Sequence, residues 1–91
     1  MAQEPSVGRI VHYVLPSGPR QGEIRPAIIT RVWQKLDYAP APGMSNLTVF
    51  RDQSDDLDPA YNPPGNTPYV AGSVYYSADK APGTWHWPER V

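Results

Sequence analysis

The side chains best suited to chemistry in this sequence are its arginines and its aromatic rings. Arginine forks hold phosphate or carboxylate groups through paired donors, and Tyr and Trp rings stack on bases and sugars. Three Trp and six Tyr are a heavy aromatic load for 91 residues. The pattern predicts a non-catalytic site for a small anionic, nucleotide-like ligand, lined by Arg25, Arg31, Tyr13, Trp33 and His86.

Each of these residues also has a structural alternative. The eight basic residues can pair with the nine acidic ones, and large rings can fill the core of a small barrel. Trp85 and Trp87 share one face of a short run with His86 opposite, and the sequence leaves open whether that pair lies inside or outside. Trp33 shares its strand face with Arg31, which favours an outward, contact-ready position for both.

Catalytic chemistry finds little support in the sequence. There is no cysteine, which excludes thiol catalysis, disulfides and zinc–thiolate sites. His12 and His86 have no nucleophile at an informative spacing, and no serine lies in a nucleophile elbow. We therefore expect a protein that is not an enzyme and needs no cofactor.

A cluster of carboxylates is the one pattern that resembles a metal site. It runs through a polar segment as Asp52, Asp55, Asp56 and Asp58. Oxygen ligands of this kind suit calcium, but the spacing lacks the glycine turn and distal glutamate of an EF-hand loop. A solvated acidic loop that keeps the protein soluble is the favoured interpretation, and no metal is expected.

Charge and hydropathy limit the classes of partner. A net charge of −1 gives no basic excess, so general nucleic-acid binding is not expected. No apolar run approaches the roughly 20 residues of a membrane span. The first residues, MAQEPSVGR, contain no apolar segment of a secretion signal, which indicates a protein of the reducing cytoplasm.

The elements that must position these side chains are short strands. Twelve prolines and seven glycines punctuate five runs rich in β-branched and aromatic residues, at 10–15, 27–33, 47–50, 70–76 and 84–87. No run has a helical period. This pattern predicts an all-β fold, a small five-stranded SH3-like barrel, with an OB-like barrel as the runner-up.

The domain organisation follows from the same pattern. Residues 1–6 form a flexible lead-in, and residues 7–91 form one small barrel domain. The long loop at 52–69 is expected to contact a ligand or a neighbouring subunit, because so long a loop is costly in a small domain. Five β-branched residues of the predicted strands are expected in the core: Val11, Ile28, Val32, Val49 and Val74.

Four stretches taken together resemble a family of short, functionally uncharacterised proteins of tailed bacteriophages and prophages. They are GRIVHYVLPSG (8–18), RPAIITRVW (25–33), NLTVFRD (46–52) and GTWHWPE (83–89). The resemblance implies a phage accessory protein in the host bacterial cytoplasm, or in the virion if it is structural. Phage proteins of this size often form homo-oligomers and sequester a nucleotide signal of host defence. A head or decoration-type virion component and an adaptor barrel that binds a host protein remain alternatives.

Overall fold

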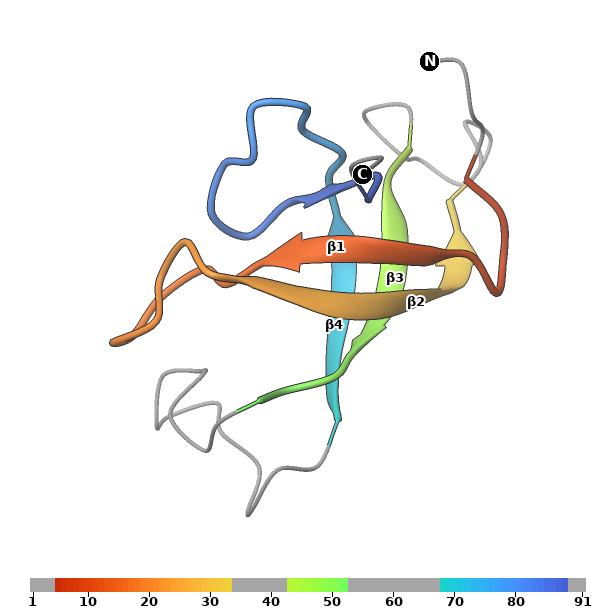
Figure 1. Ribbon diagram of the computed structural model, residues 1–91. Coiled ribbons are helices and arrows are strands. Elements are labelled where there is room, and N and C mark those ends of the chain that lie inside the picture. Colours follow the sequence, from red (N-terminus) through yellow and green to blue (C-terminus); the bar gives the residue numbers. More distant parts are fainter. Residues whose placement is uncertain (1–4, 34–42, 53–67, 89–91) are drawn as a thin grey trace.

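The computed structural model of the chain describes residues 5–33, 43–52 and 68–88, and these ranges contain five strands and no helix (Figure 1). The strands are β1 (Ile10–Val14), β2 (Ile24–Val32), β3 (Ser45–Val49), β4 (Tyr69–Val74) and β5 (Trp85–His86). The predicted all-β fold is confirmed, and every expected run overlaps one of these strands. Within the described ranges no helix has the length and apolar character needed to cross a membrane.

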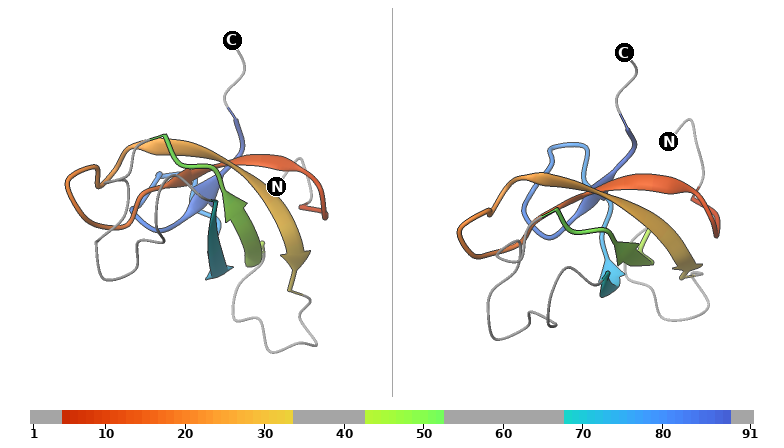
Figure 2. Two further views of the ribbon diagram at one scale, coloured as in Figure 1. Left: turned by 90° about the horizontal axis from the view of Figure 1, so that it is seen from below. Right: turned by 60° about the horizontal axis from the view of Figure 1, so that its bottom comes forward.

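The strands form one antiparallel sheet in the order β4-β3-β2-β1-β5. The sheet curls into a half-barrel, with β1 and the long β2 crossing over β3 and β4 (Figures 1 and 2). The curl brings β5 to the segment that follows β4, where the Trp85 N–H donates to the Tyr75 carbonyl (2.9 Å) and the Ser77 N–H donates to the Trp85 carbonyl (2.9 Å). A meander whose last strand returns to pair with its first is the strand order of SH3-like barrels.

Strand β2 begins earlier than the sequence indicated, at Ile24 rather than Ala27. The hairpin ladder continues past β1, because the Leu15 N–H donates to the Glu23 carbonyl (2.9 Å). Pro26 is tolerated inside β2 because it lies where the ladder to β3 ends. The Pro26 carbonyl accepts a hydrogen bond from the N–H of Phe50, one residue beyond β3 (2.9 Å). Because β3 has already ended there, no residue of β3 lacks a donor on account of the N–H that proline does not have.

A bulge in β2 decides which side chains enter the core. Ile29 lies opposite Leu47, but Arg31 lies opposite Asn46, so Thr30 is an extra residue in the strand. Before the bulge the odd-numbered residues face inward, and Ala27 and Ile29 are fully buried. After it the alternation reverses, so Arg31 faces outward.

The core prediction is right at three positions and wrong at two. Val11, Val49 and Val74 are buried as expected. Ile28 is only partly buried, because it lies on the outer face of β2 with Ile29 inward. Val32 is also only partly buried: the bulge turns it to the inner face, where it packs against the edge of the core.

Trp85 lies at the centre of the core and settles the question that the sequence left open. It is fully buried, and its Nε1–H donates to the Gly43 carbonyl (2.8 Å). The rings of Tyr76 and Trp87 pack edge-on against it, with centroid distances of 5.0 and 5.1 Å. Trp87 is half-buried, with the Arg9 guanidinium 4.8 Å from its ring centroid.

Adjacent isoleucines in β2 provide a test of this inward face. Ile29→Ala is expected to lower the free energy of unfolding by about 2–5 kcal/mol, because it leaves a cavity in the core. Ile28→Ala removes the same atoms from a half-buried site and is expected to cost clearly less. Urea unfolding followed by circular dichroism measures both values, and equal losses would show that the face assignment of β2 is wrong.

Candidate functional site

The five residues expected to line one ligand site lie in three separate places. Tyr13 and Arg25 are opposite each other on β1 and β2 and face inward. Arg31 and Trp33 lie at the other end of β2, six residues away, which is about 20 Å along a strand. His86 lies on β5. The structure therefore gathers two pairs and one single residue.

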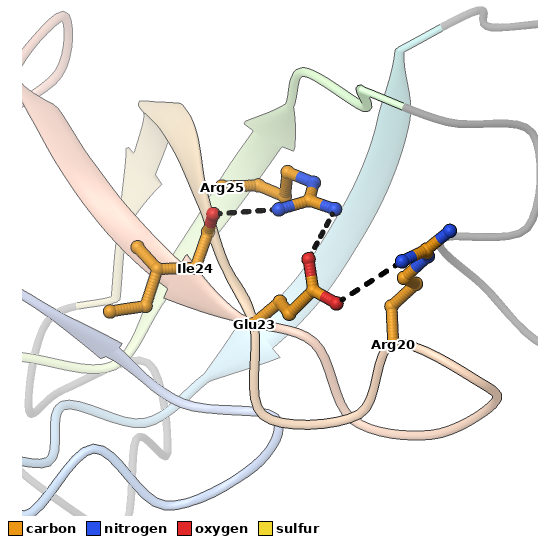
Figure 3. A network of polar contacts seen from close by, with 4 residues as sticks. All are labelled: Arg20, Glu23, Ile24 and Arg25. Atoms are coloured by element: carbon orange, nitrogen blue, oxygen red, sulfur yellow. Dashed lines mark hydrogen bonds and ion pairs between the residues drawn. The ribbon is translucent and has the colours of Figure 1, made fainter.

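Arg25 is largely enclosed by its own neighbours in the chain. Its side chain donates to the Ile24 carbonyl (3.0 Å) and to Glu23 Oε1 (3.1 Å), and only 8% of the residue is exposed. The other oxygen of Glu23 lies 3.7 Å from Arg20 Nη1, so one carboxylate links two guanidinium groups (Figure 3). Arg25 is therefore engaged in an ion pair with an acidic residue, which is the structural alternative that the sequence analysis left open.

Tyr13 is part of the core cluster together with Trp85 and Leu47. Burial raises the pKa of the Tyr13 hydroxyl to about 12 from 10.0, and the nearby Tyr69 adds to this increase. Desolvation disfavours the charged phenolate and so keeps the group neutral. A buried neutral phenol beside the core is better suited to packing than to recognition of an anion.

His86 is 4% exposed and lies opposite His12 across the β1–β5 ladder. The two imidazole rings meet edge to face with their centroids 5.6 Å apart. His86 therefore faces the opposite side of β5 from Trp85, as the alternation of the TWHWP run predicted. It is set into the β1–β5 junction, whereas Arg31 lies on the exposed surface.

Arg31 and Trp33 form the one exposed cation–aromatic pair among the predicted residues. The guanidinium carbon of Arg31 is 3.8 Å from the centroid of the Trp33 ring, which is stacking distance. Arg31 is exposed and Trp33 is half-buried. The expectation that both lie on an outward face agrees with this geometry, and the β2 bulge is its physical cause.

Asn46 fixes the position of this pair, and the sequence analysis did not identify it. Its Oδ1 atom accepts hydrogen bonds from Trp33 Nε1 (2.9 Å) and from the backbone N–H of Ser73 (2.8 Å). Its backbone carbonyl accepts from the Thr30 hydroxyl (3.2 Å). The available signal was a single amide residue between a Pro/Gly segment and an apolar strand, which is too common to indicate a role.

The second partner of Asn46 is a bulge in β4. Ser45 lies opposite Val74 and Leu47 lies opposite Ala71, so β4 has one extra residue at Gly72–Ser73. Ser73 adopts a φ of 54°, a left-handed conformation that turns its N–H toward Asn46. One side-chain oxygen therefore links the indole of β2 to the bulge of β4.

An arginine stacked on an indole is an arrangement typical of anion recognition. The contact with the Trp33 ring restricts the guanidinium of Arg31, whose N–H donors are of the kind that hold a phosphate or carboxylate. The outer face of the same plane can accept an aromatic ring or a base. In the part of the chain that the structure describes, no three His, Cys, Asp or Glu side chains gather as a metal site would require. Most of the acidic cluster and of the 52–69 loop lies outside the described residues.

Comparison of the chain with protein-family models, with curated proteins and with solved structures finds no match. The candidate site therefore depends on its own geometry: a stacked guanidinium on a strand whose outward face is set by the bulge in β2.

The buried Tyr13 hydroxyl predicts a loss of stability in alkali. Between pH 10 and pH 12 the unfolded chain releases this proton while the folded chain keeps it, so the stability present below about pH 10 declines as the pH rises. The expected slope is about 1.4 kcal/mol per pH unit. Urea unfolding across this range measures it. Tyr13→Phe should flatten the decline, whereas Tyr75→Phe, at an exposed ring, should leave it unchanged.

Asn46→Ala is expected to destabilise the fold by about 1–3 kcal/mol, because Trp33 Nε1 and the Ser73 N–H both lose their acceptor. Asn46→Asp keeps acceptor oxygens of the same size and should cost less. Urea unfolding of the two variants gives the comparison. A cost below about 0.5 kcal/mol for the alanine variant would show that the two hydrogen bonds contribute little to stability.

Proposed function

We propose that this protein is a non-enzymatic binding protein for a small anionic, nucleotide-like ligand, and that Arg31 on Trp33 is the centre of its site. The observation that carries this proposal is the stack itself, with the Arg31 guanidinium 3.8 Å from the ring centroid of Trp33 on an exposed surface. Arg25, Tyr13 and His86 are buried in the barrel and are not part of the proposed contact surface.

Preorganisation is the physical support for a binding role. A free arginine side chain loses considerable rotamer freedom when it binds a ligand. Arg31 is already held by its cation–π contact, and Trp33 is held by its hydrogen bond to Asn46. The Arg31 side chain therefore loses its rotamer freedom on folding and not on binding. A larger share of the free energy of the ligand contacts then appears as affinity.

Two contacts would define the ligand class. The guanidinium edge binds a phosphate or carboxylate through paired, charge-assisted donors. The open face of Arg31 stacks a base, so that the ligand ring, the guanidinium and the indole form three layers. Base stacking contributes about 1–3 kcal/mol in single-stranded nucleic-acid complexes, which is comparable in size to the anion contact.

The proposed setting is that of a phage accessory protein in the host bacterial cytoplasm, where binding would sequester a signal of host defence. The sequence resemblance to phage proteins supports this setting. A virion component or an adaptor for a host protein is the second candidate. The outer sheet face favours it, because several apolar side chains are exposed there, including Ile10, Phe50 and Val70.

Isothermal titration of the pure protein with cyclic dinucleotides and with ADP-ribose derivatives tests the proposal. Binding to one of these classes is expected, and Arg31→Gln should weaken it by about 10- to 100-fold, the value of a hydrogen bond to a charged group. Arg31→Lys keeps the charge but loses the planar fork, so it should bind with intermediate affinity.

Arg20→Gln is the matched control, because it removes the same charge from the surface pair with Glu23 and leaves the stack intact. Its affinity should equal that of the wild type. Absence of heat with every ligand, together with recovery of the protein from purified virions, would favour the structural candidate. An Arg31→Gln variant that binds normally would place the ligand elsewhere on the protein.

A further inference from the structure

The outer edge of β4 carries backbone groups that have no recorded partner in the described part of the chain. In the antiparallel ladder to β3, Ala71 and Tyr69 lie opposite Leu47 and Val49. The Phe50 N–H donates to Pro26 in β2, so alternation directs the backbone groups of Val49 and Leu47 toward β4. Tyr69 and Ala71 therefore bond to β3, and the N–H and C=O groups of Val70 and Gly72 point away from the sheet.

Among the described residues no strand lies beside this edge, whereas the rest of the curl is closed. Contacts that join the sheet ends begin only at Tyr75, through its bond to Trp85, and β4 forms the rim of the sheet before that point (Figures 1 and 2). Strand β4, of sequence YVAGSV, carries no charged side chain, which is the usual protection of an edge. Val70 is 71% exposed beside it.

We propose that a second copy of this chain pairs with the β4 edge, antiparallel to it, to form a two-fold symmetric dimer. With the axis at Ala71, Val70 of one copy lies opposite Gly72 of the other. Because both residues direct their N–H and C=O groups outward, all of these groups find complementary partners across the axis. The two half-barrels then share one continuous sheet, and each presents its own Arg31 stack.

Three observations favour a second copy over a strand from a different protein. The row of outward groups is short, since the Gly72–Ser73 bulge ends it. A two-fold axis repeats every hydrogen bond that this short row makes, which doubles their number. Gly72 has no side chain, so it adds no bulk beside the exposed Val70 of the partner copy; the nearest side-chain atom to the position of a Cβ there is Asn46 Oδ1, at 3.8 Å. A net charge of −1 gives little repulsion between copies.

Sedimentation equilibrium over a range of concentrations is the first test. The wild-type protein is expected to be a dimer that dissociates on dilution, and Val70→Lys is expected to be a monomer, because it places a like charge beside the axis in each copy. Val7→Lys is the matched control: Val7 is 68% exposed, precedes β1 and should leave the dimer intact. A monomeric wild type, or a dimeric Val70→Lys variant, overturns the proposal.

Amide hydrogen exchange on the wild type gives a second, independent readout that needs no variant. Tyr69 and Ala71 should be protected at every concentration, because they bond to β3. Val70 and Gly72 should exchange about tenfold or more slowly in the dimer than in the diluted monomer. A dimer in which these two amides still exchange rapidly would place the interface elsewhere and overturn the proposal.

Discussion

One side-chain oxygen, Oδ1 of Asn46, holds together the part of this barrel that is least regular. It accepts from the Trp33 indole and from the backbone of Ser73, two groups that belong to β-bulge regions on opposite sides of β3. Bulges leave ladder groups unpaired, and each hydrogen bond that replaces a lost one contributes about 0.5–1.5 kcal/mol. A single acceptor that satisfies both donors allows the bulges of β2 and β4 to lie on either side of β3. The outward position of Trp33 at the end of β2 depends on this arrangement.

The fold was predictable because its signals are local and repeated. Runs of β-branched and aromatic residues between Pro and Gly gave all five strands, and the TWHWP alternation correctly separated Trp85 from His86. The errors at Ile28 and Val32 differ in kind: Ile28 lies on the outer face before the bulge, whereas Val32 faces inward after it but reaches only the edge of the core. The sequence pattern, taken as an unbroken strand, placed both on one face. A bulge adds one residue to a strand and reverses its faces, and the Thr30 side chain carries no mark of it, because the extra residue is defined by its register with β3.

The candidate site was predictable only in part, for a related reason. The composition showed that arginine and aromatic residues were abundant, but either type can serve packing or recognition. Arg25 and Arg31 look equivalent in the sequence, yet one is enclosed by Glu23 and the other is stacked outward on Trp33. The difference arises because odd-numbered residues of β2 face inward before the bulge and outward after it. Asn46 could not be found at all, because its role depends on two partners far away in the chain.

The pairing of β5 has a consequence for the order of events in folding. Strands β1, β2 and β3 each pair with the next strand in the chain. The pairing of His12 with His86, in contrast, joins residues that are separated by most of the chain. Closing so large a loop carries the highest entropic cost and brings only a two-residue strand into the ladder. The meander can therefore assemble first and β5 dock last. The burial of Trp85 then completes the core.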